Sequence, residues 1–315
     1  MNIKILDVDT LGDDLDLEPI KKLGEVEVFS LTYAEDVIER IKDAEILILN
    51  KVKLNETNLC YAKNLKLICI TATGYDNVDI EYCRKHNIAV CNVVGYSTDS
   101  VVQLTLSMVY ALSTNLYDFD SYVKSGKYTK SGIFNYLKPT FYEMSGKTWG
   151  VVGLGNIGMK VARVAREMGC NVIVHKRTPI DEFECVDIDT LCEKSDIITL
   201  HTPLNKDTLH LINKERIEKM KDNVILVNVS RGAVVDEEEI TKAVETNKIK
   251  ALGVDVYSTE PMQENSPYQR ILDHNNVIFT PHMAWGAIEA RQRCIDEVSL
   301  NILAFEKGEK RCRVV

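Results

Sequence analysis

Short runs of apolar residues alternate with helical patterns along almost the whole chain. The runs are mostly continuous Ile, Val and Leu, as in parallel strands that are buried on both faces. A first series occupies residues 3–6, 26–29, 46–49, 67–70 and 88–91, and a second series occupies residues 149–152, 172–174, 197–200, 224–228, 251–254 and 277–279. Helix-like stretches such as Tyr33–Lys42 and Val78–His86 lie between the runs. This alternation predicts the α/β fold class, with two Rossmann-like, doubly wound parallel sheets.

The break between the two series predicts how the domains are organised. A long helix is expected from about Asp99 to Lys124, between the last run of the first series and the first run of the second. One more helix, about Ala287 to Phe305, follows the second series and is too short to form a domain. We therefore expect a second domain, residues 99–285, to be inserted into a first domain made of residues 1–98 and 286–315.

An aromatic segment follows the expected long helix. Residues 117–142 hold 8 of the 22 aromatic residues of the chain and show little periodicity beyond the end of the helix. They are Tyr117, Phe119, Tyr122, Tyr128, Phe134, Tyr136, Phe141 and Tyr142. Packing onto the chain's own domain would explain such a segment, but aromatics on an irregular arm more often mark a subunit interface. Because twofold dimers are the commonest assembly, we expect a homodimer.

Composition and charge exclude several classes of function. The net charge is −9 and no block of Lys and Arg occurs, so neither nucleic acid nor an anionic membrane is an expected partner. The start of the chain carries acids and resembles no secretory signal. The longest uncharged stretch, residues 100–117, contains seven Ser, Thr, Asn or Gln residues, as an amphipathic helix does. Nine cysteines without metal-ligand spacing indicate thiols in a reducing cytoplasm and no metal site.

A glycine-rich turn carries the most specific chemistry. Gly153, Gly155 and Gly158 have G-x-G-x-x-G spacing, directly after the apolar run 149–152 and before a helical pattern. In this context the glycines allow a tight turn, close approach of a pyrophosphate, and close packing of helix on strand. The helix start, with Asn156 and Ile157, presents free N–H groups to phosphates. The turn therefore predicts a dinucleotide site.

The end of the next strand bears on the choice between NAD and NADP. An acid at this position binds the ribose 2′-hydroxyl of NAD, but here residues 176–178 are Lys176, Arg177 and Thr178. Two cations and a hydroxyl suit a 2′-phosphate, so NADP is favoured. The alternative is that Lys176 and Arg177 form a solvated turn and that NAD binds through backbone contacts.

Five ordered motifs carry a resemblance to a known family. They are Ala72-Thr-Gly-Tyr-Asp-Asn-Val-Asp79, Gly153-Leu-Gly-Asn-Ile-Gly158, Asn228-Val-Ser-Arg-Gly-Ala233, Asp255-Val-Tyr-Ser-Thr-Glu-Pro261 and Thr280-Pro-His-Met-Ala-Trp285. In these motifs, and over nearly its whole length, the chain resembles the D-isomer-specific 2-hydroxyacid dehydrogenases. Asn50-Lys51, Gly95-Tyr-Ser-Thr98 and the segment after Pro281 look most like the glycerate dehydrogenase (hydroxypyruvate reductase) branch.

The resemblance implies a catalytic Arg231, Glu260 and His282. Arg231 follows the run 224–228, where a guanidinium can grip a carboxylate with two hydrogen bonds and polarise the adjacent carbonyl. His282 is the implied proton donor to the carbonyl oxygen, because an imidazole can act near neutral pH. Glu260 would hold the other ring nitrogen and favour the charged ring. Of the remaining histidines, His201 lies at a strand end near the implied cofactor.

Further binding residues follow from the same resemblance. Backbone N–H groups of Thr73 and Gly74 would bind the substrate carboxylate. Lys51 would add a positive charge there, with an ordinary surface lysine as the alternative. Thr202 and Pro203 would lie against the adenosine, and Asp255 would accept a hydrogen bond from the nicotinamide carboxamide.

The implied activity is reduction of a small 2-oxo acid by NAD(P)H to a D-2-hydroxy acid. Hydroxypyruvate or glyoxylate is the expected substrate, giving D-glycerate or glycolate, and pyruvate and other 2-oxo acids remain alternatives. Corepressors of the same fold retain the cofactor site and the triad, so a dinucleotide-sensing binding protein is a second hypothesis. The absence of long disordered tails favours the enzyme.

Overall fold

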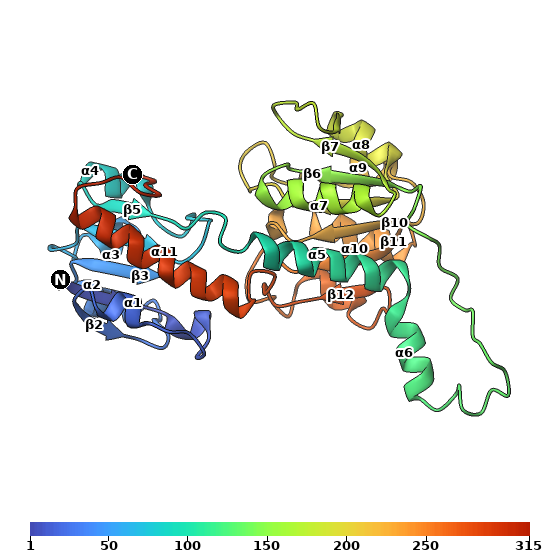
Figure 1. Cartoon of the computed structure of the whole chain (residues 1–315), viewed down its shortest axis with the longest axis horizontal. Helices are drawn as coiled ribbons and strands as arrows, with labels where there is room; N and C mark the ends of the chain where they lie inside the picture. Colours follow the sequence, from blue (N-terminus) through green and yellow to red (C-terminus); the bar gives the residue numbers. More distant parts are fainter. The chain divides into compact units, whose positions relative to one another are not determined.

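Two separate parallel sheets confirm the predicted fold class. One has five strands in the order β2-β1-β3-β4-β5, and the other has seven in the order β12-β11-β10-β9-β6-β7-β8. The computed structural model describes all 315 residues. It divides into unit 1, Met1–Ser97 with Trp285–Val315, and unit 2, Thr98–Ala284. The chain thus leaves unit 1 after its fifth strand and returns to it for the last helix and the C-terminal segment (Figure 1).

Unit 1 is a sheet with helices on both faces. Its strands are β1 (Asn2–Ile5), β2 (Glu25–Val28), β3 (Ile46–Leu49), β4 (Leu67–Ile70) and β5 (Ala89–Cys91). Its helices are η1 (Val8–Leu11), α1 (Glu18–Lys21), α2 (Val37–Ile41), α3 (Glu56–Leu59), α4 (Ile80–Lys85) and α11 (Ile288–Glu306). Along β3, Ile46 and Ile48 pack in the cluster that includes α11, whereas Leu47 and Leu49 pack with α2 and α3. This alternation buries every residue of the strand and explains its continuous apolar sequence.

Unit 2 has the same layered plan around a larger sheet. Its strands are β6 (Thr148–Val152), β7 (Asn171–His175), β8 (Glu184–Cys185), β9 (Ile197–Leu200), β10 (Val224–Asn228), β11 (Ile249–Val254) and β12 (Val277–Phe279). Its helices are α5 (Thr98–Ser113), α6 (Leu116–Lys124), α7 (Asn156–Glu167), α8 (Ile188–Lys194), α9 (Lys214–Lys219), η2 (Gly232–Val234), α10 (Glu237–Glu245) and η3 (Pro267–Ile271). Helices α8, α9 and α10 enclose an apolar cluster on one face, and α5 packs beside α7.

The expected single helix over residues 99–124 is wrong. It is broken into α5 and α6 at Asn115, which has a left-handed conformation with φ of 51°. Asparagine tolerates this conformation better than most residues, and it turns the chain away from the body of unit 2 (Figure 1). Helix α6 buries none of its residues, and the segment that follows it is largely exposed. No helix of the structure is long and apolar enough to cross a membrane.

Candidate active site

The glycine-rich turn between β6 and α7 has the geometry that a pyrophosphate needs. Gly153 has φ of +88°, which other residues rarely adopt, and a Cβ on Gly158 would lie 2.0 Å from the carbonyl oxygen of Gly153. At Gly155, in contrast, no atom lies within 4 Å of a Cβ position, so the turn is open there. The first N–H groups of α7, from Asn156 and Ile157, begin at this opening. The residues present therefore fit a dinucleotide phosphate.

A shallow hollow begins at the same turn. It is lined by Leu154, Gly155, Asn156, Met159, Lys160, Arg163 and Val164.

Lys176, Arg177 and Thr178 directly follow β7, the neighbour of β6 in the sheet. The carbonyl of His175, the last residue of β7, accepts a hydrogen bond from the N–H of Gly153 at 2.9 Å. The basic residues thus begin directly after His175, the residue that is hydrogen-bonded to the glycine turn. Lys176 is half-buried, and Arg177 and Thr178 are exposed.

The loop after β9 contacts the glycine turn from the other side. The N–H of His201 donates to the carbonyl of Val152 at 2.7 Å, and the backbone of His201 and Thr202 lies 2.8 Å from a Cβ position on Gly153. Thr202 is half-buried and Pro203 is exposed. The imidazole of His201 is buried without a hydrogen-bond partner for either nitrogen. Burial lowers the pKa of His201 to about 3, so the ring is neutral.

Arg231 lies in the loop after β10, and a close backbone contact holds this loop against the next one. A Cβ on Gly232 would lie 2.0 Å from the carbonyl carbon of Tyr257, in the loop after β11. Only glycine permits this approach, so Gly232 sets the distance between the loops that carry Arg231 and Glu260. The Arg231 guanidinium donates to the carbonyl of Ser230 at 2.8 Å. Sequence reasoning assigned no role to Gly232, although it directly follows Arg231.

Glu260 and His282 form a pair across the loops after β11 and β12. Oε2 of Glu260 lies 2.7 Å from Nδ1 of His282, and its Oε1 accepts the N–H of Tyr257 at 3.2 Å. His282 has φ of 50°, an uncommon value for a residue with a Cβ. Its side chain is about one quarter exposed. The ring is therefore held by a carboxylate on one nitrogen in a backbone conformation that the surrounding loop imposes.

Asp255 anchors the loop that carries His282. It is fully buried, and its carboxylate accepts hydrogen bonds from the Thr280 hydroxyl at 2.6 Å and from the N–H groups of Met283 and Ala284 at 2.9 and 3.0 Å. Its backbone carbonyl accepts the N–H of His282 at 2.8 Å. Burial raises the pKa of the Asp255 carboxyl, and these donors oppose that rise. The expected contact of Asp255 with a carboxamide stays a prediction.

The carboxyl ends of neighbouring strands bring these three loops together. Strands β12, β11 and β10 are adjacent and parallel, so the loops with His282, Glu260 and Arg231 leave the same edge of the sheet. Open α/β sheets bind ligands at this edge. A guanidinium and a carboxylate-held imidazole at one edge can bind an anion and deliver a proton.

In unit 1, the candidate substrate residues also follow adjacent strands. Lys51 is exposed in the loop after β3, and Thr73 and Gly74 lie in the loop after β4. The Thr73 hydroxyl donates to the carbonyl of Val93 at 2.8 Å, and the Asn92 amide donates to the carbonyl of Thr73 at 2.7 Å. The backbone of the loop after β4 is thus fixed at Thr73, which is exposed, and Gly74 beside it is half-buried.

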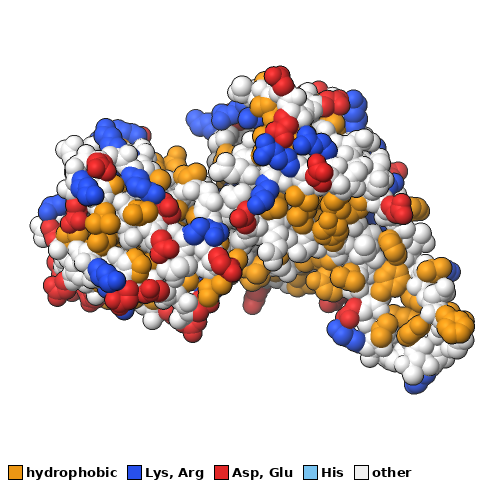
Figure 2. Space-filling view, viewed as in Figure 1, with side chains coloured by type: hydrophobic (Ala, Val, Ile, Leu, Met, Phe, Trp, Pro, Cys, Tyr) orange, Lys and Arg blue, Asp and Glu red, His pale blue; other side chains and the backbone are white.

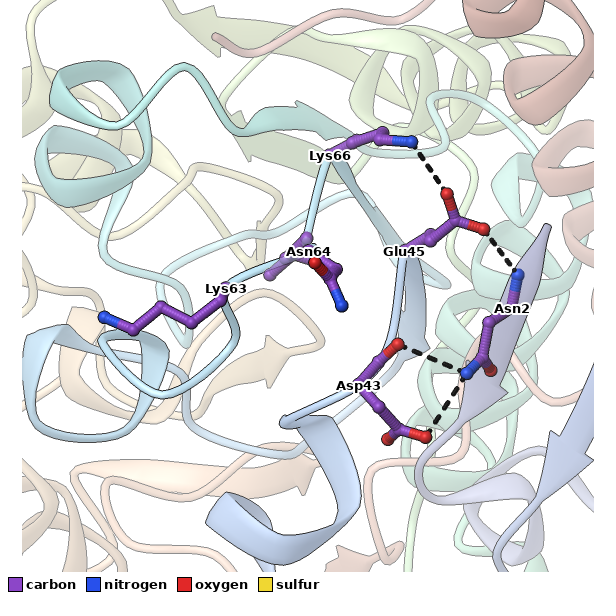
Figure 3. A pocket seen from close by; sticks show the side chains of 7 residues that line it. Asn2, Asp43, Glu45, Lys63, Asn64 and Lys66 are labelled. Carbon is purple, nitrogen blue, oxygen red and sulfur yellow. Dashed lines mark hydrogen bonds and ion pairs between the residues drawn. The ribbon is translucent and has the colours of Figure 1, made fainter.

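A polar hollow lies at the other end of the unit 1 strands and is not part of the candidate site. It is lined by Asn2, Asp43, Glu45, Lys63, Asn64, Leu65 and Lys66 (Figure 3). Its main charges already bind one another, because Glu45 accepts from Lys66 at 2.7 Å and from the N–H of Asn2 at 2.9 Å. It lies at the amino ends of β1, β3 and β4, away from the edge where such sheets bind ligands.

Comparison with known proteins gives a consistent result. Residues 106–284 match the family described as "D-isomer specific 2-hydroxyacid dehydrogenase, NAD binding domain". The chain is 34% identical to a hydroxypyruvate reductase of Blautia hydrogenotrophica over 98% of both chains. It is 35% identical to a glyoxylate reductase of Thermococcus litoralis, over 93% of this chain and 91% of the relative. Among solved structures, D-lactate dehydrogenase from Aquifex aeolicus, complexed with NAD and lactic acid, aligns with a TM-score of 0.87 and 30% identity, over 98% of this chain and 96% of that one.

Proposed function

The chain belongs to the D-isomer-specific 2-hydroxyacid dehydrogenase family and uses a nicotinamide dinucleotide, and we propose that it reduces hydroxypyruvate and glyoxylate to D-glycerate and glycolate. The names of the two relatives above support this choice of substrates. Unit 2 is the proposed NAD(P)-binding domain and unit 1 the proposed substrate domain. The observation that carries the proposal is the Glu260–His282 pair beside the Arg231 loop.

Arg231 is the proposed substrate anchor. A planar guanidinium can donate two parallel hydrogen bonds, so it can hold the carboxylate of a 2-oxo acid and polarise the adjacent carbonyl oxygen. In unit 1, Lys51 and the N–H groups of Thr73 and Gly74 are the residues proposed to bind a substrate carboxylate.

His282 is the proposed proton donor. A bound reduced nicotinamide supplies the hydride to the carbonyl carbon. His282 then gives a proton to the oxygen, which prevents an alkoxide from accumulating. Glu260 holds Nδ1 at 2.7 Å, which orients the ring and leaves proton delivery to Nε2. In the reverse direction the neutral ring accepts the proton of the hydroxy acid.

A panel of 2-oxo acids tests the proposed function. Hydroxypyruvate, glyoxylate, pyruvate and a branched 2-oxo acid are compared with NADH and with NADPH, and ranked by kcat/KM. Hydroxypyruvate and glyoxylate should rank first. If kcat/KM is highest for pyruvate, the chain is a D-lactate dehydrogenase. If it binds the dinucleotide but turns over none of the acids, a dinucleotide-sensing binding protein is favoured.

The basic residues after β7 support NADP as the preferred cofactor. Replacing Lys176 with Asp should raise the KM for NADPH roughly tenfold or more, because a 2′-phosphate would lose a charge-assisted hydrogen bond and meet a like charge. NADH use should improve, since the ribose hydroxyls gain an acceptor. Steady-state kinetics with both cofactors measure the effect, with Lys307→Asp as a control of equal charge change on the exposed end of α11. A wild type that prefers NADH, and a variant that behaves identically, would contradict this assignment.

The aromatic arm supports a homodimer. Tyr122 and Tyr136 stack with ring centroids 3.8 Å apart, and Phe119 contacts Tyr136 and Phe141 edge-on. Figure 2 shows hydrophobic side chains gathered over α6 and the loop beyond it. Phe134 is 98% exposed, which is costly for so large an apolar side chain in water. A second copy of the chain is the proposed cover.

Replacing Phe134 with Asp should therefore shift the protein toward monomer without unfolding it, because the side chain contacts little of its own chain. Sedimentation velocity at micromolar concentration reads the assembly. Tyr33→Asp, at a side chain 62% exposed in unit 1, is the matched control and should leave the dimer intact. A wild type that sediments as a monomer would rule out this interface.

The proposed location is the cytoplasm. All nine cysteines are free thiols, and six of them are buried, which is typical of proteins kept in a reducing compartment.

A further inference from the structure

A buried carboxylate in unit 1 has no role in the function proposed above. Asp7 follows the carboxyl end of β1 and is 3% exposed. Burial raises the pKa of its carboxyl, and three backbone donors and the nearby charge of Lys51 oppose that rise without a direct salt bridge. A charge is expensive to bury without such a partner, so the groups that compensate it indicate its use.

Those compensating groups are three consecutive backbone donors of another loop. Oδ1 of Asp7 accepts the N–H of Asn50 at 2.9 Å, and Oδ2 accepts the N–H groups of Lys51 and Val52 at 2.6 and 3.3 Å. The loop after β3 is thus wrapped around one carboxylate. Three donors can be gathered in this way only by a group with two acceptor oxygens, as a carboxylate has.

Other contacts hold the same loop from further sides. The Asn50 amide donates to the Thr10 hydroxyl at 3.0 Å, and the Asn77 amide donates to the carbonyls of Asn50 and Val52 at 3.2 and 2.9 Å. Asn77 belongs to the segment after β4 that follows the proposed carboxylate-binding backbone. The side chain of Val52 is buried, whereas residue Lys51 is exposed. The main chain at Lys51 is therefore fixed, while the residue itself remains exposed.

We propose that Asp7 is a positioning residue that fixes the loop of Asn50–Val52 and thereby presents Lys51 to the carboxylate of the substrate. This inference rests on the proposed role of Lys51 in substrate binding. Asp7 itself is buried, and its proposed action is through the loop and not through contact with substrate or cofactor. Asp7 acts on the geometry of substrate binding. A displacement of about 1 Å in such a geometry can lower kcat/KM up to roughly 100-fold.

The test is Asp7→Asn, which keeps the shape but turns one acceptor into a donor that faces a backbone N–H. With the full-length protein, NADPH and the acid best used among hydroxypyruvate, glyoxylate and pyruvate, KM for the acid should rise roughly 10- to 100-fold. The kcat and the Kd of NADPH should stay within about threefold, because binding of the acid alone is weakened. Amide hydrogen exchange at residues 50–52 should become faster.

A double variant separates this inference from the proposed function. If Lys51 binds the substrate, Lys51→Met raises KM, and Asp7→Asn added to Lys51→Met raises it no further, because Asp7 acts through Lys51. Full additivity of the two changes would overturn the role of Asp7 and leave that of Lys51 standing. An unchanged KM in Lys51→Met, with faster exchange in Asp7→Asn, would instead overturn the proposed substrate contact and with it the link from Asp7 to binding.

Two further variants guard against a trivial outcome. Lys4→Met removes a buried cation on β1, the strand that precedes Asp7, where Lys4 pairs with Asp43 and Glu27, and should lower stability without changing KM. A rise in KM equal to that of Asp7→Asn would mean that general loosening of unit 1 is the cause, and would overturn the proposal. Should Asp7→Asn fail to fold, Thr10→Val removes the hydroxyl that accepts from Asn50, and should raise KM alone by a smaller factor.

Discussion

Replacing His282 with Gln should lower kcat by about 10²–10⁴-fold, the usual contribution of a positioned proton donor. The amide keeps a polar group in the loop but cannot deliver a proton at neutral pH. NADPH should still bind, since His282 lies after β12 while the glycine turn lies between β6 and α7. Stopped-flow or steady-state kinetics give kcat, and fluorescence titration gives the Kd of NADPH. An unchanged kcat would remove His282 from the proposed mechanism.

The Glu260→Gln variant is the natural comparison. In the wild type, Oε2 of Glu260 lies 2.7 Å from Nδ1 of His282. The glutamine retains a group that can form a hydrogen bond to Nδ1, but it removes the negative charge beside a ring that becomes positive. The loss of kcat should therefore be smaller than in His282→Gln. Equal losses would mean that the carboxylate charge, and not only the orientation of the ring, is essential.

The parts of the fold that follow from local pattern were predicted well. Strands β3, β4 and β10 begin and end where their apolar runs do, because all their residues are buried between two layers of helices. Strand β11 begins two residues before the expected run, since Ile249 and Lys250 extend it beside β10. Strand β8 was missed because it has only two residues, Glu184 and Cys185. The break at Asn115 depends on one backbone dihedral angle. It was missed because the apolar pattern continues from the first helix into the next.

In the candidate site, too, local features were predicted and contacts between distant segments were not. The glycine turn could be found because its residues lie within six positions of one another and between a strand and a helix. Arg231, Glu260 and His282 were named through the family resemblance and not through spacing. The contacts that hold their loops escaped prediction because they join distant segments. Asp7 is 43 residues from Asn50, and Gly232 packs on Tyr257 only because β10 and β11 are neighbours.

The buried carboxylates of the two units fix neighbouring loops in the same way. Asp7 and Asp255 each follow the carboxyl end of a parallel strand, and each gathers backbone N–H groups from a neighbouring loop. In unit 2 that loop carries His282, and in unit 1 it carries Lys51. Buried charges are not efficient sources of stability. Their place beside these loops is better explained by the precision that binding and proton transfer demand of backbone geometry.

His201 should make unit 2 sensitive to acid. Burial holds the pKa of this ring at about 3 in the folded chain, against 6.5 for an exposed histidine. Between pH 6.5 and 3 the ring takes up a proton in the unfolded chain but not in the folded chain. The contribution of His201 to the free energy of unfolding is therefore fully present above pH 6.5 and is lost as the pH falls toward 3. The loss amounts to about 2 kcal/mol at pH 5 and about 4 kcal/mol at pH 3.

The comparison of wild type with His201→Leu isolates this contribution from other acid-titrating groups. Leucine removes two buried nitrogens that have no partner, so the variant should be about as stable as wild type at pH 7. At pH 5 it should be more stable than wild type by about 2 kcal/mol, measured as the free energy of unfolding of unit 2 in urea. His86→Asn, at an exposed histidine of unit 1, should change neither value by more than about 0.5 kcal/mol. Parallel pH dependences in wild type and His201→Leu would show that the ring of His201 takes up a proton as easily in the folded chain as in the unfolded one.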